Sequence, residues 1–252
     1  MRRLAAALTY ALAAGAIGLT FPIALLCRLL GAPFDRHRMA PSAALRHLGQ
    51  ALLRLAPLWS VQVEGALPPA PATFVVVPNH QSMVDALAVA CLPRNMKWIG
   101  KVEAFRIPWL GWAFRLAGYV PVLRGDRESG SAALGRLRRY LSAGIPVGLF
   151  AEGARSRDGT LRGFRAGPFK LAVDMGVPVV PVAISGAGEA MPPDQAGIRP
   201  SRIRIRILPP LPTLGLGLVD VEALREETRR RIAAALAVME GAPSPALERV
   251  GP

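Results

Sequence analysis

The chain has 252 residues, enough for one substantial α/β domain and too few for two of that size. It carries 31 lysines and arginines against 17 aspartates and glutamates, a formal net charge of +14. This charge indicates an anionic partner, such as a membrane surface, an acidic protein, a phosphorylated substrate or nucleic acid. With only two cysteines and three histidines, the composition argues against a disulfide framework and against a metal site.

An uncharged, apolar run follows Arg2 and Arg3. Residues 4–27, at about 1.5 Å per residue, would form a helix of roughly 36 Å, longer than a bilayer core of about 30 Å. The run exceeds the apolar region of a signal peptide, and its small residues lie inside it rather than after it. We therefore expect residues 1–30 to form a retained membrane anchor helix that either crosses the bilayer or lies in its interface. Basic residues on both sides leave its orientation open.

Residues 31–58 are predicted to form an amphipathic linker helix. Between Pro41 and Pro57 the leucines lie near helical spacing, whereas Arg46 and Arg54 lie off that line. Two interpretations stay open, packing of this helix on the domain and docking on the bilayer.

Residues 59–240 alternate short apolar runs with amphipathic stretches, and residues 241–252 are expected to form a flexible tail. Buried strands are predicted at residues 73–77, 119–123, 147–150 and 177–184, and a half-buried strand at 201–208. Helices are predicted at residues 85–92, 103–118 with a break at Pro108, 131–143, 163–175 after a loop, and 220–239. This alternation predicts a single α/β domain with a mostly parallel or mixed sheet flanked by helices.

Two of these strands have features of a sheet edge. Pro178 and Pro181 suit the start of a strand or an edge strand, because proline has no N–H to donate. In residues 201–208, arginines alternate with isoleucines and give the strand a basic outer face. That face would protect an edge from aggregation, or contact anionic headgroups or a carrier protein.

Aromatic residues gather in the stretch around the predicted break at Pro108. Such a group forms either part of the core or an apolar, membrane-facing wall for an acyl chain. Its members are Trp98, Phe105, Trp109, Trp112 and Phe114.

His80 and Asp85, five residues apart, follow the predicted strand 73–77. Five steps along a continuous helix turn roughly 500°, so the two side chains meet only if His80 lies in a turn and Asp85 in the first helical turn. Pro78 and Asn79 favour that turn. A histidine whose Nδ1–H donates to Asp85 presents Nε2 to a hydroxyl as a general base. The alternative is that both residues merely terminate the helix.

A second polar segment follows the predicted strand 147–150. Glu152, Gly153 and Arg155 lie at the carboxyl end of that strand, where α/β sheets present ligand sites. Arg155 can bind phosphate oxygens in a fork, Gly153 allows close backbone approach, and Glu152 can orient a hydroxyl or the arginine. A surface ion pair in a loop is the alternative. No G-x-S-x-G stretch occurs, which argues against a serine hydrolase.

Together these segments resemble the glycerolipid acyltransferases, and among them the bacterial 1-acylglycerol-3-phosphate acyltransferases. The similarity covers residues 59–210 and follows the order and spacing of the family's blocks. These blocks are Asn79-His80 with Asp85 after four further residues, then residues 101–111, 118–124, 150–156 and 180–182.

The resemblance implies that His80 is the general base, that Asp85 is its partner, and that Pro181 shapes the site. It also implies that the phosphate-bearing acceptor is bound by Lys101, Arg124, Glu152, Gly153 and Arg155. The block at residues 150–156 has Ala151 and Ala154 where the family has proline and threonine, which leaves the acceptor open. An enzyme for another lysolipid, such as a lyso-ornithine lipid, stays an alternative.

By the same resemblance, the protein transfers a fatty acyl group from acyl-CoA or acyl-carrier protein to the free hydroxyl of a lysophospholipid. The implied acceptor is 1-acylglycerol-3-phosphate, the product is phosphatidic acid, and no metal or other cofactor takes part. The implied location is the bacterial cytoplasmic (inner) membrane, with residues 59–240 as the acyltransferase domain facing the cytoplasm. The rivals are a catalytically silent membrane-surface protein and a nucleic-acid-binding protein, the latter disfavoured because the basic residues are scattered.

Overall fold

The computed structural model describes residues 2–153, 160–192 and 197–241. Within them seven strands form one sheet, in the order β1-β7-β6-β2-β5-β3-β4. The strands are β1 (Trp59–Glu64), β2 (Val75–Pro78), β3 (Lys97–Lys101), β4 (Val120–Val122), β5 (Val147–Gly148), β6 (Val179–Ser185) and β7 (Ser201–Ile207).

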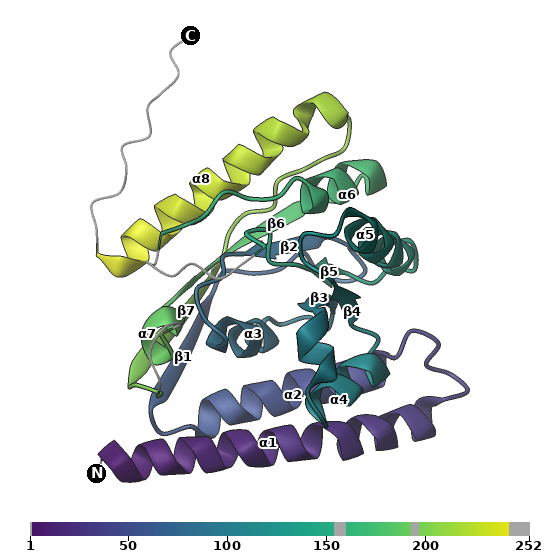
Figure 1. The fold of residues 1–252 in the computed structure, drawn as a ribbon. Helices are drawn as coiled ribbons and strands as arrows, with labels where there is room; N and C mark the ends of the chain where they lie inside the picture. Colours follow the sequence, from purple (N-terminus) through teal and green to yellow (C-terminus); the bar gives the residue numbers. More distant parts are fainter. Residues whose placement is uncertain (1, 154–159, 193–196, 242–252) are drawn as a thin grey trace.

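Helices cover both faces of the sheet (Figure 1). The helices α1 to α4 lie on one face, and α5, α6 and α8 lie on the other. The helices are α1 (Arg2–Gly31), α2 (Met39–Leu55), α3 (Val84–Ala88), α4 (Leu110–Leu116), α5 (Arg127–Ser142), α6 (Gly167–Met175), α7 (Ala187–Ala190) and α8 (Val221–Glu240), with short 3-10 turns at Val89–Cys91, Val102–Arg106 and Leu218–Asp220.

Five neighbouring strands are parallel, which confirms the predicted α/β domain with a mixed, mostly parallel sheet. β2 pairs in parallel with β5 and β6, and β3 pairs in parallel with β5 and β4. β7 runs antiparallel to β6, and β1 pairs with β7 in parallel. The strands β1 and β3 were not predicted from the sequence. Each has only a short apolar centre with charged residues at its ends, namely Glu64 in β1 and Lys97 and Lys101 in β3, so neither resembles a buried apolar run.

Both predicted edge strands lie in the interior of the sheet, so the prediction of an edge is wrong for each, whereas Pro178, directly before β6, fits the alternative of a strand start. β6 lies between β7 and β2. The carbonyl of Pro181 accepts from the N–H of Leu208 and therefore points toward β7. The position of the missing N–H faces the same side, where the register of β6 with β7 has already ended at Val182. Proline is therefore tolerated at this position. β7 lies between β1 and β6, and its arginines form contacts across β1: Arg202 with Gln62 and Arg206 with Glu64. The edges of the sheet are β1 and β4.

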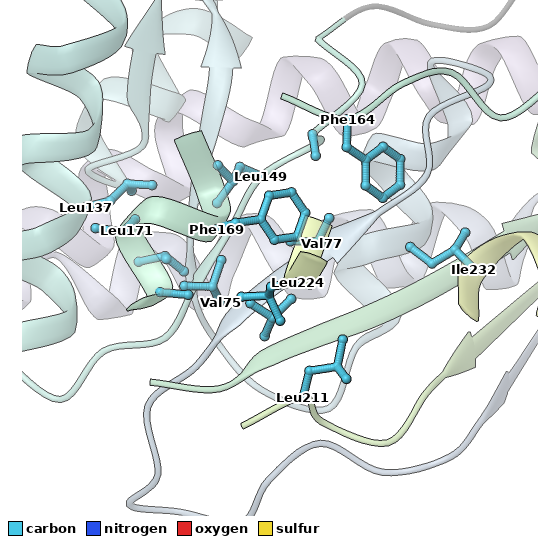
Figure 2. Packing of buried hydrophobic residues seen from close by; sticks show 14 of the residues in the cluster. Val75, Val77, Leu137, Leu149, Phe164, Phe169, Leu171, Leu211, Leu224 and Ile232 are labelled. Carbon is cyan, nitrogen blue, oxygen red and sulfur yellow. The ribbon is translucent and has the colours of Figure 1, made fainter. Parts of the chain in front are cut away.

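The sheet separates two apolar cores. Along β2, Val75 and Val77 face the helices α5, α6 and α8, whereas Val76 faces α2 and α3. Figure 2 shows the first of these cores, where Phe164 and Phe169 lie among leucines from α5, α6 and α8. Because β2 is buried on both faces, the position of its carboxyl end is fixed from above and below.

The N-terminal helix runs beside α2 and packs on α4 (Figure 1). It is the one described helix long and apolar enough to cross a membrane. Phe21 of α1 makes edge-to-face contacts with Trp109 and Trp112, which are both nearly half exposed. Phe105 instead is buried. The aromatic group therefore belongs partly to the core and partly to the surface. Neither of the two alternatives, a core group or an apolar wall, describes it completely.

A buried lysine joins this N-terminal part to the α/β domain. The ammonium of Lys97, which is 0% exposed, donates to the carbonyls of Arg38 at 2.9 Å and Ala117 at 2.7 Å. It also lies 5.5 Å from the ring centroid of Tyr140. Burial lowers the pKa of the Lys97 ammonium to about 7, and the opposing effect of the Asp35 carboxylate is smaller.

The replacement of this ammonium should change how stability depends on pH. In the unfolded chain the pKa of a lysine is near 10.5, so between about pH 7 and 10.5 the unfolded state binds more protons and stability rises with pH. Thermal unfolding in detergent micelles should show wild-type protein gaining stability relative to Lys97→Met between pH 7 and 9.5. Lys101→Met, an exposed position on the same strand, is the control. Equal pH slopes for Lys97→Met and wild type would contradict the assignment.

Candidate active site

The site begins where β2 ends. Asn79 follows Pro78, and its side-chain amide donates to the carbonyl of Ile184 at 2.9 Å and accepts from the N–H of Ile184 at 2.7 Å. Asn79 is 0% exposed, so these two bonds replace a ladder pair that the proline-terminated strand does not provide. The chain leaves β2 at a point fixed to β6, immediately before His80.

Asp85 shapes the turn that follows. One oxygen, Oδ2, accepts from Nδ1 of His80 at 2.9 Å and from the backbone N–H groups of Gln81 and Ser82 at 2.6 and 2.7 Å. Asp85 is the second residue of α3, and His80 lies in the turn, as the five-residue spacing predicts. Since Nδ1 donates to the carboxylate, Nε2 carries the lone pair and can accept a proton. The ring is 7% exposed and Asp85 is fully buried.

Two residues that follow β5 also contact His80. The rings of His80 and Phe150 are stacked, with centroids 4.2 Å apart and planes inclined by 25°. Glu152 accepts from the backbone N–H of His80 at 2.6 Å through Oε1, and from that of Arg162 at 3.1 Å through Oε2. Burial raises the pKa of the Glu152 carboxyl to about 7, although the two backbone donors oppose the rise.

The other predicted site residues lie along the same edge of the sheet. Lys101 ends β3 and lies 3.8 Å from Glu103, and Arg124 lies just after β4. Gly153 has a φ of +71°, a left-handed backbone conformation that favours glycine. Arg155 lies outside the described residues. The structure thus brings His80, Asp85 and Glu152 into contact, and substrate binding by the predicted residues stays a prediction.

Sequence reasoning did not assign Phe150 to the site and did not foresee that Glu152 holds the backbone of His80. The sequence signal for both is their place at the end of the predicted strand 147–150, in the block 150–156. The chain turns there, with the N–H of Gly153 donating to the carbonyl of Phe150, and Ala151 is buried in the core on the other face of the sheet. The described residues contain no group of three side chains suited to hold a metal ion.

The fold is that of an α/β protein in which a carboxylate holds a buried imidazole where parallel strands end, an arrangement in which Nε2 can accept a proton. Comparison with known proteins identifies the family. The sequence model of the Acyltransferase family matches residues 60–185, half of the chain, and the chain belongs to that family.

Relatives agree with this assignment over most of the chain. A 1-acyl-sn-glycerol-3-phosphate acyltransferase of Chlamydomonas reinhardtii is 37% identical over 182 residues, 71% of this chain and 54% of the relative. A human 1-acyl-sn-glycerol-3-phosphate acyltransferase alpha is 33% identical over 184 residues, 71% of this chain and 65% of the relative. The chain spans about half the length of the first curated relatives it matches.

A solved structure shares the fold along nearly the whole chain. The 1-acyl-sn-glycerophosphate (LPA) acyltransferase PlsC from Thermotoga maritima superimposes with a TM-score of 0.78 at 25% sequence identity. The match covers 97% of this chain and 100% of the other. It therefore includes both N-terminal helices as well as the sheet.

Neutralising Asp85 should remove function while preserving the fold. Asp85→Asn keeps the shape of the side chain and one acceptor oxygen, but loses the charge that stabilises an imidazolium on His80. We expect turnover to fall by about 10²- to 10⁴-fold, with little change in the detergent-solubilised protein's thermal midpoint. Asp174→Asn, on the surface beside Arg138, is the control. Near-normal turnover of Asp85→Asn would contradict the assignment of this pair.

Proposed function

We propose that the protein transfers a fatty acyl group from a thioester, either acyl-CoA or acyl-carrier protein, to the free hydroxyl of 1-acylglycerol-3-phosphate. The observation that carries the proposal is the 2.9 Å contact between Nδ1 of His80 and Asp85, at the carboxyl edge of a sheet shared with this family. The relatives' names support the acceptor. No contact of the described residues distinguishes acyl-CoA from acyl-carrier protein as the donor, so the test below uses both donors.

The chemistry needs one base and no enzyme nucleophile. Nε2 of His80 accepts the proton of the acceptor hydroxyl while the oxygen forms a bond to the thioester carbonyl carbon. The tetrahedral adduct then expels the sulfur, which takes the proton from the imidazolium and leaves as the free thiol. Asp85 stabilises the positive charge on the ring between these two steps.

The apolar helices lie on the same side of the sheet as the imidazole. Phe150, on which the ring of His80 stacks, packs against the core covered by α2 and α3, and α1 lies beyond α2 on that side (Figure 1). A lipid acceptor approaching from α1 and α4 therefore meets the face that carries the base. This arrangement supports a membrane-bound acceptor.

The packing of α1 favours an interfacial position over a spanning one. Because α1 lies alongside α2, a crossing α1 would carry Arg46 and Arg54 into the hydrocarbon layer, which costs about 2.5–3.5 kcal/mol for each central arginine. Leu29, Leu30 and Phe34 are 64%, 75% and 91% exposed, a surface suited to one leaflet. We place the helix in the headgroup boundary, facing the cytoplasm of a bacterium.

Removal of the base should abolish acyl transfer. His80→Ala, purified in micelles with a palmitoyl donor, should release free thiol about 10²- to 10⁴-fold more slowly than wild type. Thiol release is measured with acyl-CoA and with acyl-carrier protein, each with 1-acylglycerol-3-phosphate or a lyso-ornithine lipid as acceptor. His47→Ala, an exposed histidine of α2, is the control.

The acceptor panel separates the alternatives. Turnover with the lyso-ornithine lipid alone would reassign the acceptor and keep the chemistry. If wild type releases no thiol with any combination of donor and acceptor, the protein is a catalytically silent binding protein. Wild-type rates in His80→Ala would remove the general base from the proposal.

Exposed apolar residues at the end of α1 should hold the protein on vesicles. The double substitution Leu30→Glu with Phe34→Glu removes two side chains whose burial contributes about 1.5–3 kcal/mol each. We expect at least a tenfold loss of binding to phosphatidylglycerol vesicles in flotation. Leu214→Glu with Val219→Glu, equally exposed positions before α8, is the matched control. An equal loss in both pairs would argue against α1 as the membrane surface.

A further inference from the structure

The segment after β5 contacts His80 at two separate points. Phe150 covers one face of the imidazole, and the carboxylate of Glu152 accepts from its backbone N–H. Ala151, between them, is 1% exposed and packs into the core on the opposite face of the sheet. The turn after β5, in which the N–H of Gly153 donates to the carbonyl of Phe150, thus directs two side chains at one histidine, while the third anchors the segment.

Each contact fixes something that Asp85 leaves undetermined. A single hydrogen bond from Nδ1 fixes one atom of the ring but allows the plane to rock about that bond. An aromatic ring stacked at 4.2 Å limits this rocking. The 2.6 Å bond from the backbone N–H to Glu152 fixes the position of the Cα to which the ring is attached.

The stacked pair rests on a further aromatic ring. Trp98 of β3 lies with its ring centroid 5.9 Å from that of Phe150, inclined by 32°. Space for the indole depends on Gly148 of β5, where an added Cβ would lie 2.4 Å from Cζ3 of Trp98. Gly148, Trp98 and Phe150 therefore form a continuous support from the sheet to the imidazole.

Glu152 uses both carboxylate oxygens on the main chain. Oε1 accepts from His80 and Oε2 from Arg162, and the side chain is 6% exposed. These bonds join the turn after β2 to the segment that leads into α6. Glu152 is therefore better suited to hold the site together than to bind a substrate hydroxyl.

We propose that Phe150 and Glu152 are positioning residues for His80, and that the segment after β5 serves to orient the imidazole rather than only to bind the acceptor. This inference rests on the proposed general-base function of His80. Phe150 sets the plane of the ring, Glu152 sets the position of its backbone, and Trp98 with Gly148 supports Phe150. Nε2 is thereby held toward the hydroxyl that it deprotonates.

Steady-state kinetics of variants at Phe150, with a control variant at Phe164, tests the proposal. Phe150→Leu should lower kcat about 10- to 100-fold with the acceptor KM within threefold of wild type, because chemistry and not binding is impaired. Phe150→Tyr, which keeps the stacked ring, should restore kcat to within about threefold. Gly148→Ala, which displaces Trp98, should lower kcat in the same way. Glu152→Gln should also lower kcat with the acceptor KM within threefold.

Phe164→Leu is the control, because Phe164 also belongs to a stacked aromatic pair but lies in the core on the other face of the sheet (Figure 2). It should leave kcat of the folded fraction within twofold of wild type. An acceptor KM raised by Phe150→Leu or Glu152→Gln at unchanged kcat would overturn the proposal in favour of substrate binding. Equal losses of kcat in Phe150→Leu and Phe164→Leu would reduce the effect to general packing.

A second measurement does not depend on acyl transfer. Carbethoxylation of histidines, followed by peptide mass spectrometry, should modify His80 at least fivefold faster in Phe150→Leu than in wild type, with His37 unchanged. If wild type transfers no acyl group but His80 reacts faster in Phe150→Leu, the proposed function fails and the orienting role stands. An unchanged His80 rate together with an unchanged kcat would refute the orienting role itself.

Discussion

The site depends on a single carboxylate oxygen. Oδ2 of Asp85 accepts from Nδ1 of His80 and from two consecutive backbone N–H groups. The same atom therefore sets the shape of the turn and the orientation of the ring within it. Three donors therefore converge on one oxygen of a fully buried side chain. The turn and the imidazole are consequently fixed together.

Strand order supplies the rest of the site. β5 pairs directly with β2, so the segment after β5 emerges beside the turn after β2, although the two are about 70 residues apart in the chain. β6 pairs with the other side of β2 and receives the amide of Asn79. The histidine thus lies at the ends of three neighbouring strands: Phe150 and Glu152 after β5 contact it directly, and Asn79 after β2 bonds to Ile184 of β6.

Local contacts could be predicted from the sequence, whereas contacts set by strand order could not. The meeting of His80 and Asp85 can be predicted because Pro78 and Asn79 favour a turn that leaves His80 outside the helix of Asp85, and the α/β class follows from alternating apolar runs. The bond from Glu152 to His80 requires that β5 adjoin β2, which no local pattern specifies. Because strand order is not specified locally, the sequence also predicts β7 as an edge strand. Its alternating arginines are equally compatible with an interior strand whose outer face is polar.

The buried ammonium of Lys97 has a consequence for the modularity of the chain. Its two carbonyl acceptors belong to the loop before α2 and to the end of α4, so one side chain of β3 links these segments to the sheet. A fragment lacking the first 38 residues would leave that charge in an apolar setting with half of its acceptors gone. The N-terminal part of the chain and the α/β domain are therefore linked through a buried side chain and do not form independent modules.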